Sequence, residues 1–370
     1  MNQHFIENTI IRLCQKPRSF DFISSNLFGL DPIVIKEYLN GLESKKKVKK
    51  LKDLWIVKGY KTKKEIKKLD LSEHKNYLKD HIPYFDLFKK PHPLDFEWRN
   101  SAKTLDSLTD VLLKNNVEKE NVLLLGMPSL FVSSFLKKVP QNVTLIEKNK
   151  PLLSTIAKYV DESSNHKIIN EDIFTLNHTT VGKFNSVFMD PPWYPDHFYH
   201  FIWLASQCLE IGGVLGISIP PINTRPGVDQ ERIDWFSYCQ KLGLCLESLD
   251  TQKLEYVMPF FEFNAFRSAG LENIQPFWRK GDFALFRKTD HKELPRPNTT
   301  NKEILWVERE IGEVRFRIKI EKHLKYPDTV VIDHLVNGDI LPSVSSRDLR
   351  RQEANLWTTG NRIFNVKNPQ

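Results

Sequence analysis

The sequence predicts an α/β protein built on a doubly wound, mainly parallel sheet, with a small N-terminal helical domain and a small C-terminal α+β extension. Three observations predict it. Strand-like apolar runs alternate with helical stretches over residues 101–290. Amphipathic segments and a lysine-rich hairpin pattern precede this region, and alternating apolar and charged residues follow it. We therefore predict an N-terminal domain over 1–60, a connecting segment over 61–100, a main domain over 101–290 and an extension over 300–370.

Composition excludes several classes of protein. The chain has 370 residues, of which 40% are hydrophobic, but it lacks the run of about 18 apolar residues that a membrane span needs. Its first residues do not resemble a secretory signal, so we predict a cytoplasmic protein with no membrane partner. The four cysteines show no CxxC spacing, and His166 and His178 lack partners at ligand spacing. Reduced thiols and no metal site are expected.

The N-terminal region predicts three helices followed by a hairpin. Ile6, Ile10 and Leu13 recur at helical spacing, and Asp31-Pro32 is typical of a helix start with a capping side chain and a first-turn proline. The predicted helices cover 2–15, 20–27 and 31–42, and the predicted strands cover 48–51 and 54–57. Over about residues 2–58 this order resembles the winged helix-turn-helix family.

Positive charge is concentrated beside this hairpin. Of the net charge of +8, the segment from Lys45 to Lys68 supplies +10, because twelve lysines face only Asp53 and Glu65. The rest of the chain therefore carries 8 − 10 = −2. The functional interpretation places the third helix in a groove and the lysines on phosphates, which makes DNA or RNA the expected partner. The alternative is a solvated hairpin on a domain that docks proteins or dimerises. No oligomeric state is predicted.

The connecting segment is rich in prolines and aromatic residues, among them Pro91, Pro93, Phe96 and Trp98. A free linker would not need so many aromatic side chains. We expect the segment to lie across the surface of the following domain.

Polar residues follow the predicted strands of the main domain. The strands cover 122–126, 143–147, 167–170, 184–190 and 214–219. Gly126 closes the first, Glu147 closes the second, Asp172 follows the third and Asp190 closes the fourth. In a doubly wound sheet the ligand binds beyond the carboxyl ends of the strands, and an acidic residue about 20 positions past the glycine turn accepts hydrogen bonds from a ribose. Glu147, 21 residues after Gly126, fits that role.

Asp190-Pro191-Pro192-Trp193 completes the pattern. Across residues 101–290 the layout resembles the class I, Rossmann-like methyltransferases, and this tetrapeptide resembles that of the amino-methyltransferases within them. The resemblance implies S-adenosylmethionine as cofactor, held by Gly126, Met127, Pro128, Glu147 and Asp172. It also implies methyl transfer to an exocyclic amine, most often N6 of adenine.

The chemistry requires these residue types. An aromatic amine is a poor nucleophile because its lone pair is delocalised into the ring. The Asp190 carboxylate and the Pro191 carbonyl can both accept from the NH2 group, which aims the lone pair at the methyl donor. Pro192 stiffens the corner, and Trp193 offers a face on which a base stacks. The structural alternative is a strand-ending turn with Trp193 in the core.

The loop after the fifth strand is the expected substrate side of the site. Arg225 in this loop is a candidate for a substrate phosphate or carboxylate, with Asn223 and Tyr194 as further substrate contacts. A structural role for Arg225 is the alternative. The segment 260–264, FFEFN, is expected to pack in the core rather than to recognise a ligand.

Two other functions remain open on the sequence. The glycine loop is reduced to Gly126-Met127-Pro128, which also allows a non-catalytic nucleic-acid-binding protein. Branched-polyamine synthases likewise join a winged-helix-like domain to a Rossmann-like domain and can carry a DPP turn. A polycation needs several carboxylates, and after Asp190 only Asp196 is nearby, which disfavours an aminopropyltransferase.

The C-terminal extension predicts a hairpin over 303–320 around Gly312. Its end combines arginines, including Arg350, Arg351 and Arg362, with Trp357. Two roles are possible for these arginines: contact with nucleic acid, or salt bridges within a small domain.

Overall fold

The computed structural model describes residues 3–58, 88–160, 164–271, 274–298, 306–319, 329–345 and 348–367. The chain divides into two compact units. Unit 1 consists of Met1–Lys89, Asn100–Val257 and Gln275–Thr299, and unit 2 of Lys90–Arg99, Met258–Ile274 and Thr300–Gln370. The N-terminal region thus belongs with the main domain, and residues 258–274, which we expected within the main domain, belong to unit 2. Most of the connecting segment, 61–87, lies outside the described residues.

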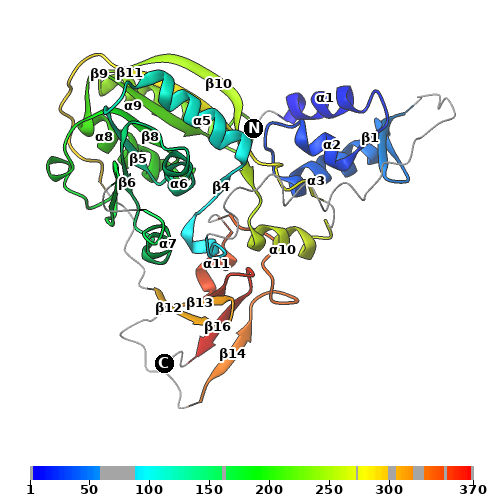
Figure 1. Cartoon of the computed structure of the whole chain (residues 1–370). Helices are drawn as coiled ribbons and strands as arrows, with labels where there is room; N and C mark the ends of the chain where they lie inside the picture. Colours follow the sequence, from blue (N-terminus) through cyan, green and yellow to red (C-terminus); the bar gives the residue numbers. More distant parts are fainter. Residues whose placement is uncertain are drawn as a thin grey trace. The chain divides into compact units, whose positions relative to one another are not determined.

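The N-terminal domain of unit 1 has the predicted order of three helices and a hairpin (Figure 1). Asp31 caps the third helix, since its Oδ1 accepts a 2.8 Å hydrogen bond from the Ile33 amide, and Pro32 opens the first turn. Ile10, Ile35 and Leu39 are fully buried in the small core between the helices. The elements are α1 Gln3–Leu13, β1 Arg18–Ser19, α2 Phe20–Ser25, α3 Pro32–Ser44, β2 Val48–Leu51 and β3 Leu54–Val57.

The main domain of unit 1 contains an eight-stranded sheet in the order β4-β10-β11-β9-β8-β5-β6-β7. The five strands β9, β8, β5, β6 and β7 are parallel; β11 pairs with β9 in antiparallel orientation, and β10 pairs with β11 in antiparallel orientation. Helices cover both faces (Figure 1), so the predicted doubly wound, mainly parallel α/β fold is confirmed. Its elements are β4 Arg99–Asn100, α5 Ala102–Asn115, β5 Asn121–Leu125, α6 Pro128–Leu136, β6 Asn142–Ile146, α7 Lys150–Ile156, β7 His166–Ile169, β8 Phe184–Met189, α8 Pro195–Cys208, β9 Leu209–Ile219, α9 Val228–Lys241, β10 Leu244–Val257 and β11 Lys280–Lys288.

Close packing fixes the sheet against its helices. β5 is the middle one of the five parallel strands, as expected of a strand whose apolar run is buried on both faces. A Cβ at Gly216 on β9 would come within 2.6 Å of Phe188 and 2.7 Å of Phe283, whose rings lie parallel on either side of it. Between the helices, the rings of Phe198 and Trp235 stack at 3.8 Å. These contacts leave little freedom at the strand ends, where the predicted site lies.

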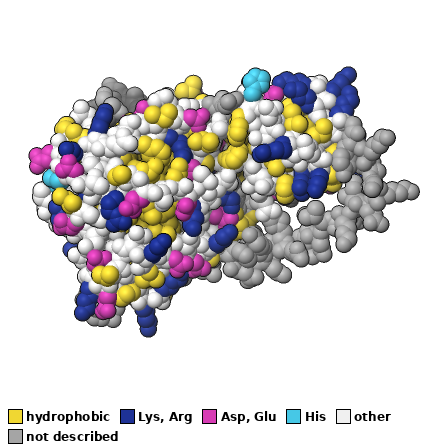
Figure 2. Space-filling view, turned by 90° about the horizontal axis from the view of Figure 1, so that it is seen from above, with side chains coloured by type: hydrophobic (Ala, Val, Ile, Leu, Met, Phe, Trp, Pro, Cys, Tyr) yellow, Lys and Arg dark blue, Asp and Glu magenta, His cyan; other side chains and the backbone are white. Residues whose placement is uncertain are grey.

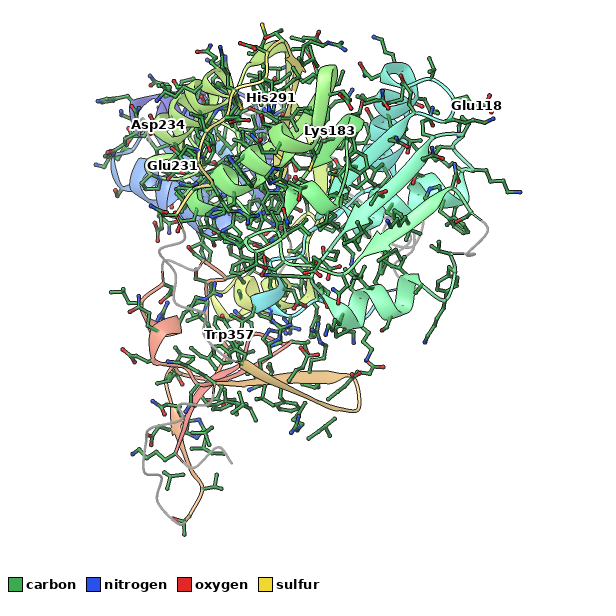
Figure 3. All side chains as sticks on the ribbon, turned by 90° about the vertical axis from the view of Figure 1, so that its left-hand side faces the viewer. Glu118, Lys183, Glu231, Asp234, His291 and Trp357 are labelled. Carbon is green, nitrogen blue, oxygen red and sulfur yellow. The ribbon has the colours of Figure 1, made fainter. Side chains whose placement is uncertain are left out.

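Unit 2 is built on a five-stranded sheet in the order β12-β13-β15-β16-β14. The predicted hairpin is present as β12 and β13, joined at Gly312 with φ +59°. One face carries the core with the buried Trp357 (Figure 3) and the buried Asp95, which pairs with Arg315 at 2.7 Å. Its elements are η2 Pro93–Asp95, α10 Phe260–Ser268, β12 Trp306–Ile311, β13 Val314–Lys319, β14 Val331–His334, α11 Arg350–Glu353, β15 Leu356–Thr358 and β16 Ile363–Lys367.

Several side chains singled out in the sequence have local structural roles. All four cysteines are free thiols, and only Cys245 is exposed. His166 is buried against Ser134 at 2.9 Å, and burial lowers its pKa to about 4. Within the described ranges no group of three or more His, Cys, Asp or Glu side chains is arranged to hold a metal ion. No helix among the same residues has the length and apolarity needed to traverse a bilayer.

Candidate active site

The predicted site residues follow neighbouring parallel strands. Asp190 follows β8, Gly126 follows β5, Glu147 follows β6 and Asp172 comes three residues after β7. These four strands are adjacent in the order β8-β5-β6-β7 and run in the same direction. The structure therefore brings the four positions side by side along one edge of the sheet.

The turn after β5 depends on Gly126. Its φ is +63°, in the left-handed region that glycine adopts without strain, and its amide donates to the Ile146 carbonyl at 3.1 Å. Met127 is buried, and Pro128 opens α6, which has no side-chain cap on its first amides. A Cβ at Gly126 would lie 3.7 Å from the Asp190 carbonyl oxygen, so the glycine turn and the Asp190 corner are in direct contact.

Glu147 and Asp172 both accept hydrogen bonds from backbone amides shortly after them in the chain, and Asp172 Oδ2 also lies 3.5 Å from the ammonium group of Lys148. Glu147 Oε1 accepts from the Asn149 amide at 2.9 Å, and Asp172 Oδ1 accepts from the Phe174 amide at 3.0 Å. Both side chains are partly exposed. These bonds orient the two carboxylates at the carboxyl edge, where Glu147 was predicted to bind a ribose and Asp172 to face an adenine.

Phe174 and His197 form an aromatic cluster beside Asp172 that we did not predict. Their rings meet edge to face at 5.1 Å, and Phe174 also contacts the ring of His200 at 4.3 Å. Burial lowers the pKa of His197 to about 4, so its imidazole is neutral at pH 7. A neutral, flat, partly buried surface next to a carboxylate suits the adenine end of a nucleoside.

The Asp190 carboxylate is held by a hydrogen-bonded chain from two other strands. Tyr256 on β10 donates to Asp190 Oδ1 at 3.0 Å, and the Tyr256 hydroxyl lies 2.5 Å from the Ser218 hydroxyl on β9. Tyr256 and Ser218 are fully buried, whereas Asp190 is partly exposed. One oxygen of the Asp190 carboxylate is thus fixed by Tyr256, while the residue as a whole is partly exposed.

The environment of this chain changes its proton affinities. Burial raises the pKa of Asp190 to about 6, against the opposing effects of the Ser218 and Tyr256 hydroxyls and of nearby Arg279. Burial and the adjacent Asp190 raise the pKa of Tyr256 well above its ordinary value, so Tyr256 stays protonated and donates. Asp190 is therefore an acceptor whose ionisation falls close to neutral pH.

The two prolines and Trp193 form a rigid corner after Asp190. The Pro192 carbonyl accepts from the Tyr194 amide at 2.6 Å, whereas no hydrogen bond among the described residues uses the Pro191 carbonyl. Trp193 is partly exposed and meets Tyr256 edge to face at 5.8 Å. The Trp193 ring packs against the main core but remains partly exposed, next to the tyrosine that donates to Asp190.

Arg279 and Gly281 on the β11 side complete the surroundings of Trp193. The Arg279 guanidinium lies 5.4 Å from the centre of the Trp193 ring and 5.1 Å from that of Trp278. A Cβ at Gly281 would come within 3.1 Å of Tyr256 and 3.3 Å of Trp193, so glycine allows both rings to approach β11. Neither residue was predicted, since their positions depend on the antiparallel return of β11.

Arg225 is bound within the chain. Its guanidinium pairs with the carboxylate of Glu231 on α9 through both terminal nitrogens and donates to the Trp193 carbonyl at 3.0 Å. This geometry corresponds to the structural alternative for Arg225: it ties the loop after β9 to the Asp190 corner. Asn223, with φ +61°, is buried and donates its amide to Asp229 at 2.9 Å, and the partly exposed Tyr194 precedes α8.

The N-terminal domain contacts the same region of unit 1. A Cβ at Gly29 would lie 3.0 Å from the backbone nitrogen and oxygen of Lys280, so the turn before α3 packs against the start of β11. Burial raises the pKa of Asp31, the cap of α3, and the charge of Arg279 opposes the rise. The first turn of a recognition helix is the part that enters a DNA groove. Gly29, in the turn before α3, packs against the main domain, and the insertion of the third helix into a groove remains a prediction.

The exposed side of α3 carries acidic side chains. The exposed residues of α3 are Glu37, Asn40, Glu43 and Ser44, two of them acidic. The lysines of the hairpin remain on the surface, and Figure 2 shows lysine and arginine side chains gathered over this domain at the right of the view. The ammonium groups of Lys45 and Lys47 lie 2.8 and 3.9 Å from the carboxylate oxygens of Glu7, so this acidic side chain offsets part of their charge. Part of the predicted basic region, residues 59–68, lies outside the described residues.

No protein-family model and no curated protein matches this sequence. Among solved structures, the chain is similar to the branched-chain polyamine synthase of Thermus thermophilus in complex with N4-aminopropylspermidine and 5′-methylthioadenosine, with a TM-score of 0.61, 11% identity and coverage of 80% of this chain and 91% of that one. A mutein of that synthase gives a TM-score of 0.62. N-methyltransferase NodS from Bradyrhizobium japonicum covers 50% of this chain with a TM-score of 0.35 and 12% identity. The similarity to the synthase supports the Rossmann-like fold of the chain.

Proposed function

We propose that this protein transfers a methyl group from S-adenosylmethionine to an exocyclic amine, with N6 of an adenine in DNA or RNA as the acceptor. The observation that carries the proposal is Asp190, a carboxylate fixed by Tyr256 at the carboxyl edge of β8, in contact with the glycine turn and beside an aromatic ring. A hydrogen-bond acceptor, a stacking surface and a nucleoside-type binding edge are the parts that methylation of an aromatic amine needs.

The residues along the sheet edge fit the cofactor. Glu147 and Asp172 would hold the ribose and adenine end, and the Gly126 turn with the first amides of α6 would face the amino-acid end. When bound, S-adenosylmethionine supplies an electrophilic methyl group on a sulfonium. Sulfur keeps the electron pair of the broken C–S bond, and the acceptor nitrogen forms the new N–C bond.

Asp190 and Pro191 orient the acceptor in this proposal. The Asp190 carboxylate and the Pro191 carbonyl accept from the two N–H groups of the amine, which places the nitrogen lone pair toward the methyl carbon. The proton that the nitrogen loses after methylation passes to Asp190, whose raised pKa suits it to take up a proton near pH 6. Trp193 stacks on the base, and Arg225 keeps the corner in place by binding the Trp193 carbonyl.

A second candidate is transfer of an aminopropyl group to a polyamine, which the similarity to the branched-chain polyamine synthase favours. The charges at the site oppose it. A polyamine is a polycation and needs several carboxylates, whereas Arg279 lies beside Trp193 and the only acidic residue of the corner itself is Asp190. A neutral base with a phosphate nearby fits these charges better.

Acceptor competition distinguishes the two candidates. The purified chain is incubated with methyl-labelled S-adenosylmethionine and an adenine-containing oligonucleotide, and separately with decarboxylated S-adenosylmethionine and spermidine, and products are identified by mass spectrometry. Formation of methyladenine in the first reaction alone supports the proposal. In Asp190→Ala the rate of methyl transfer is expected to fall by at least about 100-fold, while calorimetry shows that S-adenosylmethionine binding is retained. Aminopropylated spermidine alone would replace it by the second candidate, and binding without any product would leave a non-catalytic nucleotide-binding protein.

A further inference from the structure

Unit 2 carries a groove of about 970 Å³ on its own surface. Three phenylalanines and three cationic side chains line it: Phe260, Phe316, Phe364, Lys90, Arg267 and Arg362. Phe260 lies on α10, Phe316 on β13 and Phe364 on β16. The groove is therefore formed between one helix and one face of the five-stranded sheet.

The register of the sheet explains why two of these aromatic rings share a face. Phe316 pairs with Thr358 of β15, and Phe364 pairs with Leu356 of the same strand. Thr358 and Leu356 are two residues apart, so their side chains and those of their partners project from the same face. Trp357, between them, points into the core on the opposite face.

The aromatic side chains of the groove are accessible. Phe260 is 46% exposed, and Phe316 and Phe364 are partly exposed. An antiparallel sheet that buries only one face normally presents polar side chains on the other. Exposed aromatic rings gathered in a groove indicate a binding surface for flat ligands. Our prediction that residues 260–264 pack in the core therefore holds for the buried Phe261 and is wrong for Phe260.

The charges of the groove favour an anion. Lys90 lies 5.4 Å from the centre of the Phe260 ring, and Arg267 and Arg362 are exposed. Glu313 is the one acidic residue of the lining, where it pairs with Lys90 at 2.7 Å, and Arg362 lies 3.7 Å from Asp339. Both ion pairs are exposed to water, where such pairs contribute little and can exchange partners with a phosphate. The lining carries three positive charges against one negative charge.

We propose that this groove binds single-stranded nucleic acid, with bases stacked on Phe260, Phe316 and Phe364 and phosphates on Lys90, Arg267 and Arg362. Interleaved aromatic and cationic side chains on an open sheet face suit splayed bases, since every base has a flat face and every linkage a negative charge. A duplex hides its base faces and would leave the phenylalanines without partners. The inference rests on the proposed function, for which it names a single strand as the acceptor polymer.

Fluorescence anisotropy of the full chain tests the proposal. The probes are labelled single-stranded oligonucleotides of mixed sequence, as RNA and as DNA, and the matching duplexes. Phe260→Ala is expected to weaken single-strand binding about 10-fold, and Phe260→Trp to retain it, because stacking needs an aromatic face. Arg267→Glu with Arg362→Glu is expected to weaken binding and to make the dependence of log Kd on log salt less steep by about 0.7 per lost contact.

The matched control is Lys367→Glu, which reverses an exposed charge on β16 outside the groove lining and is expected to leave affinity unchanged. Three results would overturn the proposal: unchanged affinity in the groove variants, equal affinity for duplex, or displacement of the strand by polyglutamate at the same concentration of charge. Methyl transfer to adenosine monophosphate, measured in parallel, separates this inference from the proposed function. If the groove variants weaken strand binding but no methyl transfer is detected, the groove is a binding site for single strands and the proposed methyltransferase activity is wrong.

Discussion

Tyr256 donates a 3.0 Å hydrogen bond to Asp190 from 66 positions further along the chain, and its own hydroxyl lies 2.5 Å from that of Ser218. Strands β9 and β10 and the turn after β8 each contribute one member of this chain of polar groups. Since Tyr256 and Ser218 are buried, their position is set by the packed sheet and not by solvent. The first prediction follows from this bond.

Tyr256→Phe is expected to move the acid limb of the pH–activity profile to higher pH. Burial raises the pKa of Asp190 to about 6, and the hydrogen bond from Tyr256 lowers it, because the bond favours the ionised carboxylate. Activity that needs the carboxylate is therefore lost as the pH falls through about 6, and loss of the bond shifts this limb upward. The measurement is log kcat from pH 5 to 9. An equal loss at every pH would contradict the prediction, and Tyr159→Phe, at an exposed tyrosine, serves as control.

Glu147→Ala is expected to weaken S-adenosylmethionine binding about 10-fold or more. The carboxylate is expected to accept from the ribose hydroxyls, and a hydrogen bond to a charged group contributes about 1.5 to 3 kcal/mol. Calorimetric titration gives the dissociation constant. Glu118→Ala is the matched control, since Glu118 lies exposed on the loop before the amino end of β5 (Figure 3). Equal affinities in both variants would remove Glu147 from the cofactor site.

Glu231→Gln is expected to reduce turnover while leaving cofactor affinity unchanged. Glu231 holds Arg225, which in turn holds the Trp193 carbonyl, so weakening the first pair loosens the corner that orients the acceptor. Because the pair is partly buried, we expect a loss of roughly tenfold in kcat. Asp234→Asn on the same helix, whose carboxylate accepts from Gln230 on the surface, is the control (Figure 3). A parallel loss of cofactor binding would indicate a disturbed fold instead.

Arg232→Ala is expected to destabilise unit 1 by about 3 to 5 kcal/mol. Arg232 pairs with Asp282 at 2.7 Å and donates to the Pro220 carbonyl, and both charged side chains are buried. Removing the guanidinium leaves the Asp282 carboxylate buried without its cation. Urea unfolding measures the change, with Arg287→Ala as control because the ion pair of Arg287 with Glu247 is partly exposed. Similar unfolding midpoints for the two variants would refute the prediction.

The glycine turn, the two carboxylates after β6 and β7 and the Asp190 corner were all predicted to follow parallel strands at the carboxyl edge of the sheet. The period of apolar residues determines which segments are strands, and the parallel fold then brings their carboxyl ends together. Arg225 shows where this reasoning stops. Its loop was predicted at the correct edge of the sheet. Whether Arg225 binds a ligand or Glu231 depends on where α9 packs, and the local sequence does not determine that position.

The sequence by itself determined the class of the fold and the residues at the ends of the parallel strands, because alternation and turn chemistry act over a few neighbouring residues. Only the tertiary structure decided what surrounds them. The long antiparallel pair β10 and β11 brings Tyr256 and Arg279 to Asp190 and Trp193, and the turn before α3 packs at Lys280. In unit 2, strand register alone sets Phe316 and Phe364 on one face. Such contacts join residues far apart in the chain, and their free energy comes from packing the whole domain.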